Sequence, residues 1–270
     1  IKQHMTLANF LVEQFRQFPQ VEAIGISGSL MSGLGSETSD IDLYIFGSPI
    51  VPVEERIHIA EIRGYTRADF NNQYWDTGDE WFDTPTGIAV DEMFWDLDWL
   101  ADRIAAVLDR HEASTGYTTC HWHTMRQMGI LFDRSGRLAA LKTKAQMDYP
   151  ESLCKNIIEK NQPLLHNAIP AYTNQLKKAI SRGDLVSINH RFAEYLASYF
   201  DILFALNRLP HPGEKRLITF AIDHCQKLPT RFEEDLTALL SWSGAADGAW
   251  LERLDHLNRA MDMLLSENDF

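Results

Sequence analysis

The stretch that decides the fold runs Gly28-Ser29-Leu30-Met31-Ser32-Gly33-Leu34-Gly35-Ser36-Glu37-Thr38-Ser39-Asp40-Ile41-Asp42-Leu43. It follows a short apolar run, residues 24–27, which predicts a buried strand that Gly28-Ser29 interrupts. A helix beginning at this break would leave backbone N–H groups unpaired beside a serine hydroxyl. Such groups suit the oxygens of a phosphate. The start of the stretch therefore predicts a phosphate-binding turn, although an ordinary Gly-Ser turn fits the same residues.

The end of the stretch predicts a strand with two acids on one face. Residue types alternate from Asp40 to Phe46, so Asp40 and Asp42 share a face with Tyr44, and the opposite face is apolar. Neighbouring carboxylates repel each other and need a counter-charge. Carboxylate oxygens select Mg²⁺ or Mn²⁺ rather than zinc. We predict a divalent metal site at Asp40 and Asp42; the alternative is a strand-entry cap with Asp42 in solvent.

The order of these residues resembles the signature of a known superfamily. Gly28-Ser29, followed by Ser39-Asp40-Ile41-Asp42-Leu43 with eleven residues from Ser29 to Asp40, is similar to the motif of nucleotidyltransferases such as DNA polymerase beta and the antibiotic nucleotidyltransferases. The chain resembles above all the stand-alone bacterial aminoglycoside-type adenylyltransferases, which carry a helical carboxy-terminal domain. The resemblance implies attack by an acceptor hydroxyl on the α-phosphorus of ATP or another NTP. Gly28, Ser29 and Ser39 would contact the nucleotide.

A third acid is expected on the strand Ile88–Trp95. Asp91 shares a face with Ala89, Met93 and Trp95, whereas Glu92 shares the more apolar face with Ile88, Val90 and Phe94. If the apolar face packs under helices, Asp91 emerges on the same side as the first two acids. In similar enzymes an acid at this position binds the metal or accepts the proton of the hydroxyl. We predict that role for Asp91, with Glu92 as the alternative; a further possibility is that both acids leave the strand edge.

Composition narrows the class of partner. The 270 residues include 38 acidic and 25 basic side chains, and the formal net charge of −13 opposes binding of DNA or RNA. The same charge favours a cationic acceptor. Three widely separated cysteines do not indicate a disulfide framework, so the cytoplasm is the expected compartment. Without an apolar run of about 20 residues, no membrane span is expected. The His4-Met5 junction suggests a native start at Met5.

The pattern of elements predicts an α+β chain of two domains. A mixed sheet with flanking helices is expected over residues 1–148, and a helical bundle over residues 149–270, with the boundary at Tyr149-Pro150-Glu151. Helices are expected at 5–18, 51–63, 98–110, 138–147, 152–167, 170–182, 185–208, 214–226, 230–242 and 248–266. Cys120, His121 and His123 do not have the spacing of a closed zinc site.

An acceptor pocket is predicted beside the segment 71–87. This acid-rich and aromatic segment is expected to form an exposed hairpin, in which Trp75 or Trp81 would offer a stacking surface. Asp76, Asp79 and Glu80 would attract a cation. The alternative is an acidic loop whose aromatic side chains only cover the sheet.

Lys215 is the predicted phosphate contact of the helical domain. It lies in the basic, turn-rich segment 206–216, which resembles the loop from which related helical domains send a lysine to the phosphates of the nucleotide. A lysine at the amino end of a helix is unfavourably placed, and an anionic ligand would relieve this. Arg208 and Arg216 are weaker candidates, and a solvated basic turn is the alternative.

The sequence therefore predicts Mg²⁺-dependent transfer of a nucleoside monophosphate to a hydroxyl of a small acceptor. Asp40, Asp42 and Asp91 would be the catalytic and metal-binding residues, and Gly28, Ser29, Ser39 and Lys215 would bind the nucleotide. One alternative is transfer of AMP to a protein hydroxyl. The other is a nucleotide-binding module without turnover. The base, the acceptor and the oligomeric state are not set by these patterns.

Overall fold

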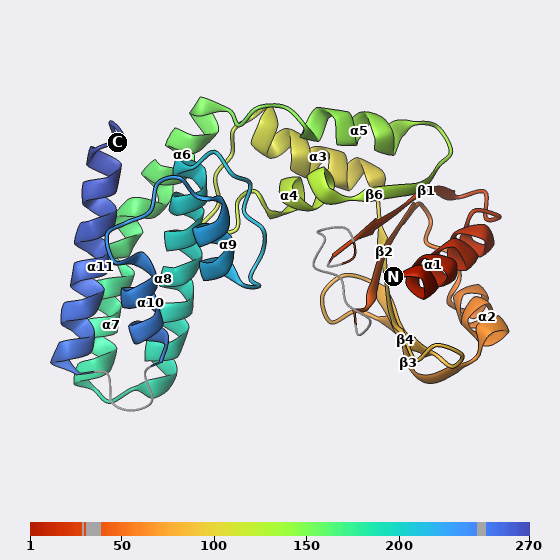
Figure 1. The fold of residues 1–270 in the computed structure, drawn as a ribbon, viewed down its shortest axis with the longest axis horizontal. Coiled ribbons are helices and arrows are strands. Elements are labelled where there is room, and N and C mark those ends of the chain that lie inside the picture. The colour runs from red at the N-terminus through yellow and green to blue at the C-terminus, as the bar shows by residue number, and fades with distance from the viewer. Residues whose placement is uncertain (29, 31–38, 242–246) are drawn as a thin grey trace. The chain divides into compact units, whose positions relative to one another are not determined.

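The computed structural model describes residues 1–28, 30, 39–241 and 247–270 (Figure 1). The chain forms two compact units. The first contains Ile1–Ala105 and His121–Met147, and the second contains Ala106–Cys120 and Asp148–Phe270. Each unit has its own core, so the two are described separately.

A six-stranded mixed sheet forms the centre of the first unit, with the strand order β3-β4-β5-β2-β1-β6. Only β2 and β5 run parallel among the pairs of the described strands; the other neighbours are antiparallel. This arrangement and the helices that follow confirm the predicted α+β class. The strands are β1 (Val21–Ser27), β2 (Ile41–Gly47), β3 (Tyr65–Asn72), β4 (Gly78–Asp83), β5 (Ala89–Trp95) and β6 (Gly129–Asp133).

Two helices, α1 (Lys2–Phe15) and α2 (Val53–Arg63), cover the apolar face of this sheet. Leu7 and Leu11 of α1 are buried with Ile41, Leu43 and other alternate residues of the strands, as expected for strands that bury one face. Helix α1 begins before the predicted start at Met5. The reason is that His4 is buried and its Nε2 lies 2.9 Å from the carbonyl oxygen of Ser39, which ties the helix to the start of β2.

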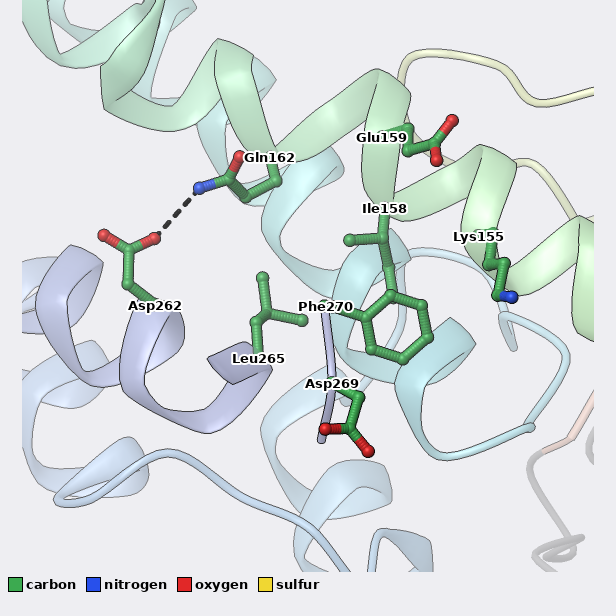
Figure 2. Close-up of a pocket in the computed structure, with 8 residues that line it drawn as sticks. All are labelled: Lys155, Ile158, Glu159, Gln162, Asp262, Leu265, Asp269 and Phe270. Atoms are coloured by element: carbon green, nitrogen blue, oxygen red, sulfur yellow. Dashed lines mark hydrogen bonds between the residues drawn. The ribbon is translucent and has the colours of Figure 1, made fainter. Parts of the chain in front are cut away.

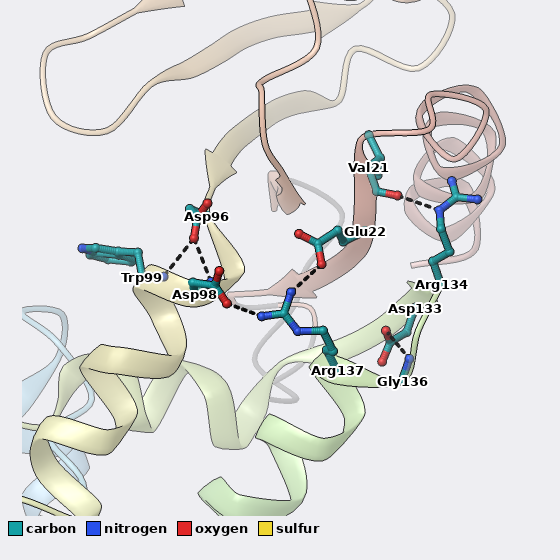
Figure 3. A network of polar contacts seen from close by, with 9 residues as sticks. All are labelled: Val21, Glu22, Asp96, Asp98, Trp99, Asp133, Arg134, Gly136 and Arg137. Carbon is teal, nitrogen blue, oxygen red and sulfur yellow. Dashed lines mark hydrogen bonds and ion pairs between the residues drawn. The ribbon is translucent and has the colours of Figure 1, made fainter.

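The opposite face receives α3 (Leu97–Leu108), α4 (Cys120–Gln127) and α5 (Arg137–Ala145) at one end. Met128, which follows α4, packs directly against Gly25 of β1: a Cβ at Gly25 would lie 2.4 Å from the Met128 sulfur. Figure 3 shows a second attachment, in which the Arg137 guanidinium bridges Glu22 of β1 and Asp98 of α3. The other end of this face, near the start of β2, carries the acids.

The second unit is helical, as predicted. Its core contains large side chains of the longest described helix, all of them buried: Tyr195, Tyr199, Phe200, Leu203 and Phe204. Pro163 has no N–H to continue the hydrogen bonds of α6, and a π-helix, η1, begins at this residue. The elements are α6 (Glu151–Gln162), η1 (Pro163–Asn167), α7 (Tyr172–Ser181), α8 (Leu185–Leu206), α9 (Leu217–His224), α10 (Phe232–Leu240) and α11 (Gly248–Ser266).

The segment Ala106–Cys120 also belongs to this helical unit, whereas the predicted division at residues 148 and 149 assigned it to the sheet domain. Side chains of two helices hold it. Asn161 of α6 accepts a hydrogen bond from the Gly116 N–H at 3.1 Å. Asp201 of α8 accepts from the Thr118 N–H at 3.1 Å and from the Thr118 hydroxyl at 2.6 Å. These contacts join residues far apart in sequence, so the order of elements alone does not predict them.

Asp201 makes folding of this unit pH-dependent. Burial raises the pKa of Asp201 to about 7, although the two Thr118 donors oppose the shift. The folded state therefore holds a proton that the unfolded chain loses near pH 4, and stability falls between about pH 4 and pH 7 by up to ~1.4 kcal/mol per pH unit. Asp201→Asn should flatten this decline in urea denaturation followed by circular dichroism. Parallel profiles for the variant and the wild type would contradict the assignment.

Candidate active site

A row of acids crosses the first unit at one level of the sheet. Asp42 of β2 is the register partner of Asp91 on β5, and Asp91 is the register partner of Glu80 on β4. Glu80 in turn pairs with Asp69 of β3. Residues directly opposite each other on neighbouring strands point to the same face. Four carboxylates from four strands therefore share one face, with Asp42 and Asp91 half-buried and the outer two exposed.

The structure separates Asp91 from its neighbour Glu92. Asp91 lies on the face of Asp42, whereas Glu92 is 1% exposed and is the partner of Leu43 on the face covered by helices. Burial, followed by the charge of Asp79, raises the pKa of Glu92 well above its ordinary value. Asp91, and not Glu92, is thus the acid that lies beside Asp42 on the same face of the sheet.

Asp40 is not brought into the same group. It precedes β2 and is exposed, because the strand begins at Ile41. Within the described ranges, no three His, Cys, Asp or Glu side chains are arranged so that together they could hold a metal ion. The oxygen donors of Asp42 and Asp91 suit a hard divalent cation, and the structure supplies this pair rather than the full predicted set.

Gly28 lies against the carboxylate of Asp42. Its φ is +75°, and a Cβ at this position would lie only 1.8 Å from Oδ2 of Asp42. A side chain at residue 28 would therefore displace the acid, as well as strain the backbone. Ser39 precedes β2 and holds His4 through its carbonyl oxygen. The predicted nucleotide contact Ser29 lies outside the described residues.

Aromatic side chains extend the same face beyond the acids. The Tyr44 ring contacts the Trp95 ring with a centroid distance of 4.6 Å, and Trp95 also contacts Trp99 and His121. Burial, and then the charges of Asp42, Asp91 and Asp76, raise the pKa of the Tyr44 hydroxyl above its ordinary value. Sequence reasoning missed this cluster as part of the site. The signal was present, because Tyr44 is two residues after Asp42 and Trp95 is four residues after Asp91, and even spacing puts residues of a strand on the same face.

Part of the predicted acceptor pocket is wrong. Asp79 and Trp81 are buried on the helix-covered face, where Asp79 accepts a 2.8 Å hydrogen bond from the Arg56 guanidinium. Trp81 packs in the core because its register partner is Val90. Asp76, Glu80 and Trp75 remain exposed, and Asp76 accepts a hydrogen bond from Trp95 Nε1 at 3.1 Å. Acids and aromatic residues do not alternate regularly in β4, so the sequence pattern did not show which of its residues face inward.

Lys215 lies in the second unit, in the turn before α9. Its side chain is exposed and makes no hydrogen bond or ion pair within the part of the chain that the structure describes. The Arg208 guanidinium is engaged within the helical unit, because it donates hydrogen bonds to Glu151 Oε2 at 2.6 Å and to Cys154 Sγ at 2.7 Å. Arg216 has a φ of +55° and caps α9, so the helix begins at Leu217, later than predicted.

Cys120 and His121, which are adjacent in the Cys-His segment considered above for zinc binding, contact different side chains. The Cys120 sulfur lies 3.5 Å from Nδ1 of His211, whereas the His121 ring lies against Trp95 and Trp99.

A separate groove of about 610 Å³ lies between α6 and α11 of the helical unit (Figure 2). Figure 2 shows Ile158, Leu265 and Phe270 together in it, with Gln162 hydrogen-bonded to Asp262 at 3.0 Å nearby. None of the predicted site residues is among those that line it.

Comparison with known proteins found a matching family model and several matching solved structures. Residues 119–216 match the family described as Domain of unknown function (DUF4037). Among solved structures, the chain is similar to a nucleotidyltransferase-like protein from Exiguobacterium sibiricum 255-15. The TM-score is 0.46 and the sequence identity 14%, with 95% of this chain and 72% of that chain covered. No curated protein matches the chain.

In the described ranges, no helix is both long and apolar enough to cross a membrane.

Proposed function

We propose that the chain is a nucleotidyltransferase that transfers a nucleoside monophosphate, AMP from ATP in the first instance, to a hydroxyl of a small acceptor. One observation carries the proposal: Asp42 and Asp91 stand at the same level on adjacent parallel strands, with Gly28 turned against Asp42. Two like charges placed side by side are unfavourable without a cation between them. The sequence motif of Gly28, Ser29, Asp40 and Asp42 supports the same reaction.

Asp42 and Asp91 would hold Mg²⁺ or Mn²⁺. Asp40, which precedes β2 and is not grouped with them, would become a further ligand only by moving toward the ion. The ion would neutralise charge on the phosphate oxygens. Gly28 and Ser29 would contact the β- and γ-phosphates through backbone N–H groups and the serine hydroxyl, and Ser39 would bind beside them.

The reaction itself is a displacement at phosphorus. The acceptor oxygen forms a bond to the α-phosphorus, the bond from that phosphorus to the bridging oxygen breaks, and pyrophosphate leaves with the electron pair. The hydroxyl proton goes to a base, for which Asp91 is the candidate. Most of the acceleration would come from positioning and charge.

The acceptor is expected to be a small cationic compound. Asp69 and Glu80 extend the acid row outward on the same face, and the rings of Tyr44 and Trp95 lie beside the two half-buried acids. An exposed ion pair and an exposed cation–π contact are each worth only about 1 kcal/mol, so several must act together. Binding of such an acceptor should weaken as salt is raised.

Mass spectrometry after incubation with labelled NTPs and Mg²⁺ tests the proposal. The acceptor panel contains hydroxylated amines, neutral sugars and proteins. A mass increase of one nucleotide on a hydroxylated amine supports it. Transfer to a protein hydroxyl alone indicates protein AMPylation, and nucleotide binding without any transfer indicates a non-catalytic module; either result overturns the small-acceptor proposal.

Lys215 is proposed to contact the β- and γ-phosphates. Lys215→Ala should therefore lower ATP affinity about tenfold or more and leave AMP affinity nearly unchanged, because AMP lacks those two groups. Calorimetry with both nucleotides measures this difference. Lys178→Ala, which removes an exposed lysine from α7, is the matched control and should alter neither affinity. Equal losses for ATP and AMP, or no loss, would remove Lys215 from the site.

A further inference from the structure

The turn that carries Lys215 is held from inside the helical unit by one buried histidine. His211 lies four residues before Lys215 and is fully buried, whereas Lys215 is exposed. The His211 backbone N–H donates to the Thr119 hydroxyl at 2.7 Å. Its ring lies between Tyr117, with a centroid distance of 4.8 Å, and Phe204 of α8, at 5.0 Å.

The His211 ring also shapes the turn itself. Nδ1 accepts a hydrogen bond from the Gly213 N–H at 3.1 Å, so this nitrogen carries no proton. The Cys120 sulfur faces the same nitrogen at 3.5 Å, and because burial raises the pKa of Cys120 to about 12, its thiol keeps a proton that it can donate to Nδ1. Gly213 has a φ of +104°, a conformation that side chains rarely adopt.

These contacts leave few ways for the turn to move. Asn207 anchors its start, donating to the Leu203 and Lys227 carbonyl oxygens at 2.9 Å and accepting from the Lys227 N–H. Arg216 ends it as the positive-φ cap of α9. The His211 ring lies between these anchors and ties the turn to Tyr117 and Cys120. Without the ring, the turn keeps the bond from the residue 211 N–H to Thr119 but loses the acceptor for Gly213 and both aromatic contacts.

We propose that His211 is a positioning residue that fixes Lys215 for the phosphates of the nucleotide. The inference rests on the proposed function, because it assumes that Lys215 meets a triphosphate. His211 itself is buried and need not touch the nucleotide. Its effect should therefore appear only through Lys215. A lysine whose backbone is held in one place loses less conformational freedom when it binds than a lysine on a loose turn.

Three variants separate positioning from simple folding. His211→Ala removes the Nδ1 acceptor and the ring. His211→Asn is the conservative variant, because its side-chain oxygen can replace Nδ1 as the acceptor for Gly213. The double variant His211→Ala with Lys215→Ala tests whether the two residues act as one unit. Thermal unfolding is measured for each, so that affinities are compared only between folded proteins.

Calorimetry should show that His211→Ala lowers ATP affinity about tenfold while AMP affinity changes less than twofold. His211→Asn should restore most of the ATP affinity, and the double variant should bind ATP no more weakly than Lys215→Ala alone. Equal losses for ATP and AMP, additive losses in the double variant, or failure of His211→Asn to recover would overturn the proposal.

The outcome for Lys215 is read separately. If Lys215→Ala leaves ATP affinity unchanged, the phosphate contact fails and the positioning role fails with it, but the carboxylate site is untouched. If His211→Ala does not fold, the wild type and His211→Asn are compared by amide hydrogen exchange with and without ATP. Protection of residues 211–216 by ATP and not by AMP supports positioning, and equal protection by both nucleotides overturns it.

Discussion

Gly28→Ala is expected to reduce nucleotide transfer by on the order of 100-fold, because it displaces the carboxylate of Asp42. A Cβ at residue 28 would lie 1.8 Å from Asp42 Oδ2, so the acid must rotate or the turn must move. The positive φ adds strain of about 1–2 kcal/mol. Steady-state assays and Mg²⁺-dependent ATP binding measure the functional loss, and urea denaturation measures the cost in stability.

Gly136→Ala is the matched control for this strain. Gly136 has a φ of +77°, close to that of Gly28, but among the described residues no atom outside its own chain neighbours lies within 4 Å of its Cβ position. The two variants should therefore lose similar stability from the backbone, and only Gly28→Ala should lose transfer. If both variants lose activity equally, or if Gly28→Ala remains fully active, Gly28 does not support the acid site.

Asp42→Asn and Asp91→Asn are expected to abolish most transfer while leaving the fold at least as stable. Each carboxylate would contribute several kcal/mol to holding charge at the phosphate, which corresponds to roughly 10³-fold in rate. The two acids are register partners, and removing one charge relieves a repulsion of about 0.2–1 kcal/mol. The variants should therefore gain stability as they lose activity, a trade-off expected of catalytic residues.

Glu80→Gln is the control for this pair. Glu80 stands next to Asp91 in the same row, but it is exposed and lies one strand further out. Its replacement should change the transfer rate less than tenfold at saturating acceptor. Loss of stability in Asp42→Asn and Asp91→Asn, or a larger effect of Glu80→Gln than of either, would show that the row has a structural role instead.

The sequence predicted the structure best where apolar and polar residues alternate without interruption along a strand. Alternation from Asp40 to Phe46 predicted a strand, and β2 covers Ile41–Gly47. The same reasoning on residues 88–95 put Asp91 and Glu92 on opposite faces, as the structure has them. Both strands are central in the sheet, so one face must pack under helices and the pattern is strong.

Prediction from the sequence failed where pairing between strands decides which face of the sheet a side chain is on. In β4, the acids Asp79 and Glu80 are adjacent, and only the pairing with β5 and the buried Arg56 shows which one points inward. Residues 106–120 joined the helical unit through Asn161 and Asp201, contacts that no local pattern reports. The catalytic and binding roles of these residues stay predictions, because they depend on ligands as well as on the fold.

The most direct test of the central claim is a calorimetric titration of ATP into the wild type and Asp42→Asn, each in Mg²⁺ and in EDTA. The carboxylate site predicts that Mg²⁺ strengthens ATP binding to the wild type at least tenfold, and that Asp42→Asn loses this difference while its circular dichroism spectrum is unchanged. Equal ATP affinity in Mg²⁺ and EDTA, together with an unchanged affinity in Asp42→Asn, would contradict it.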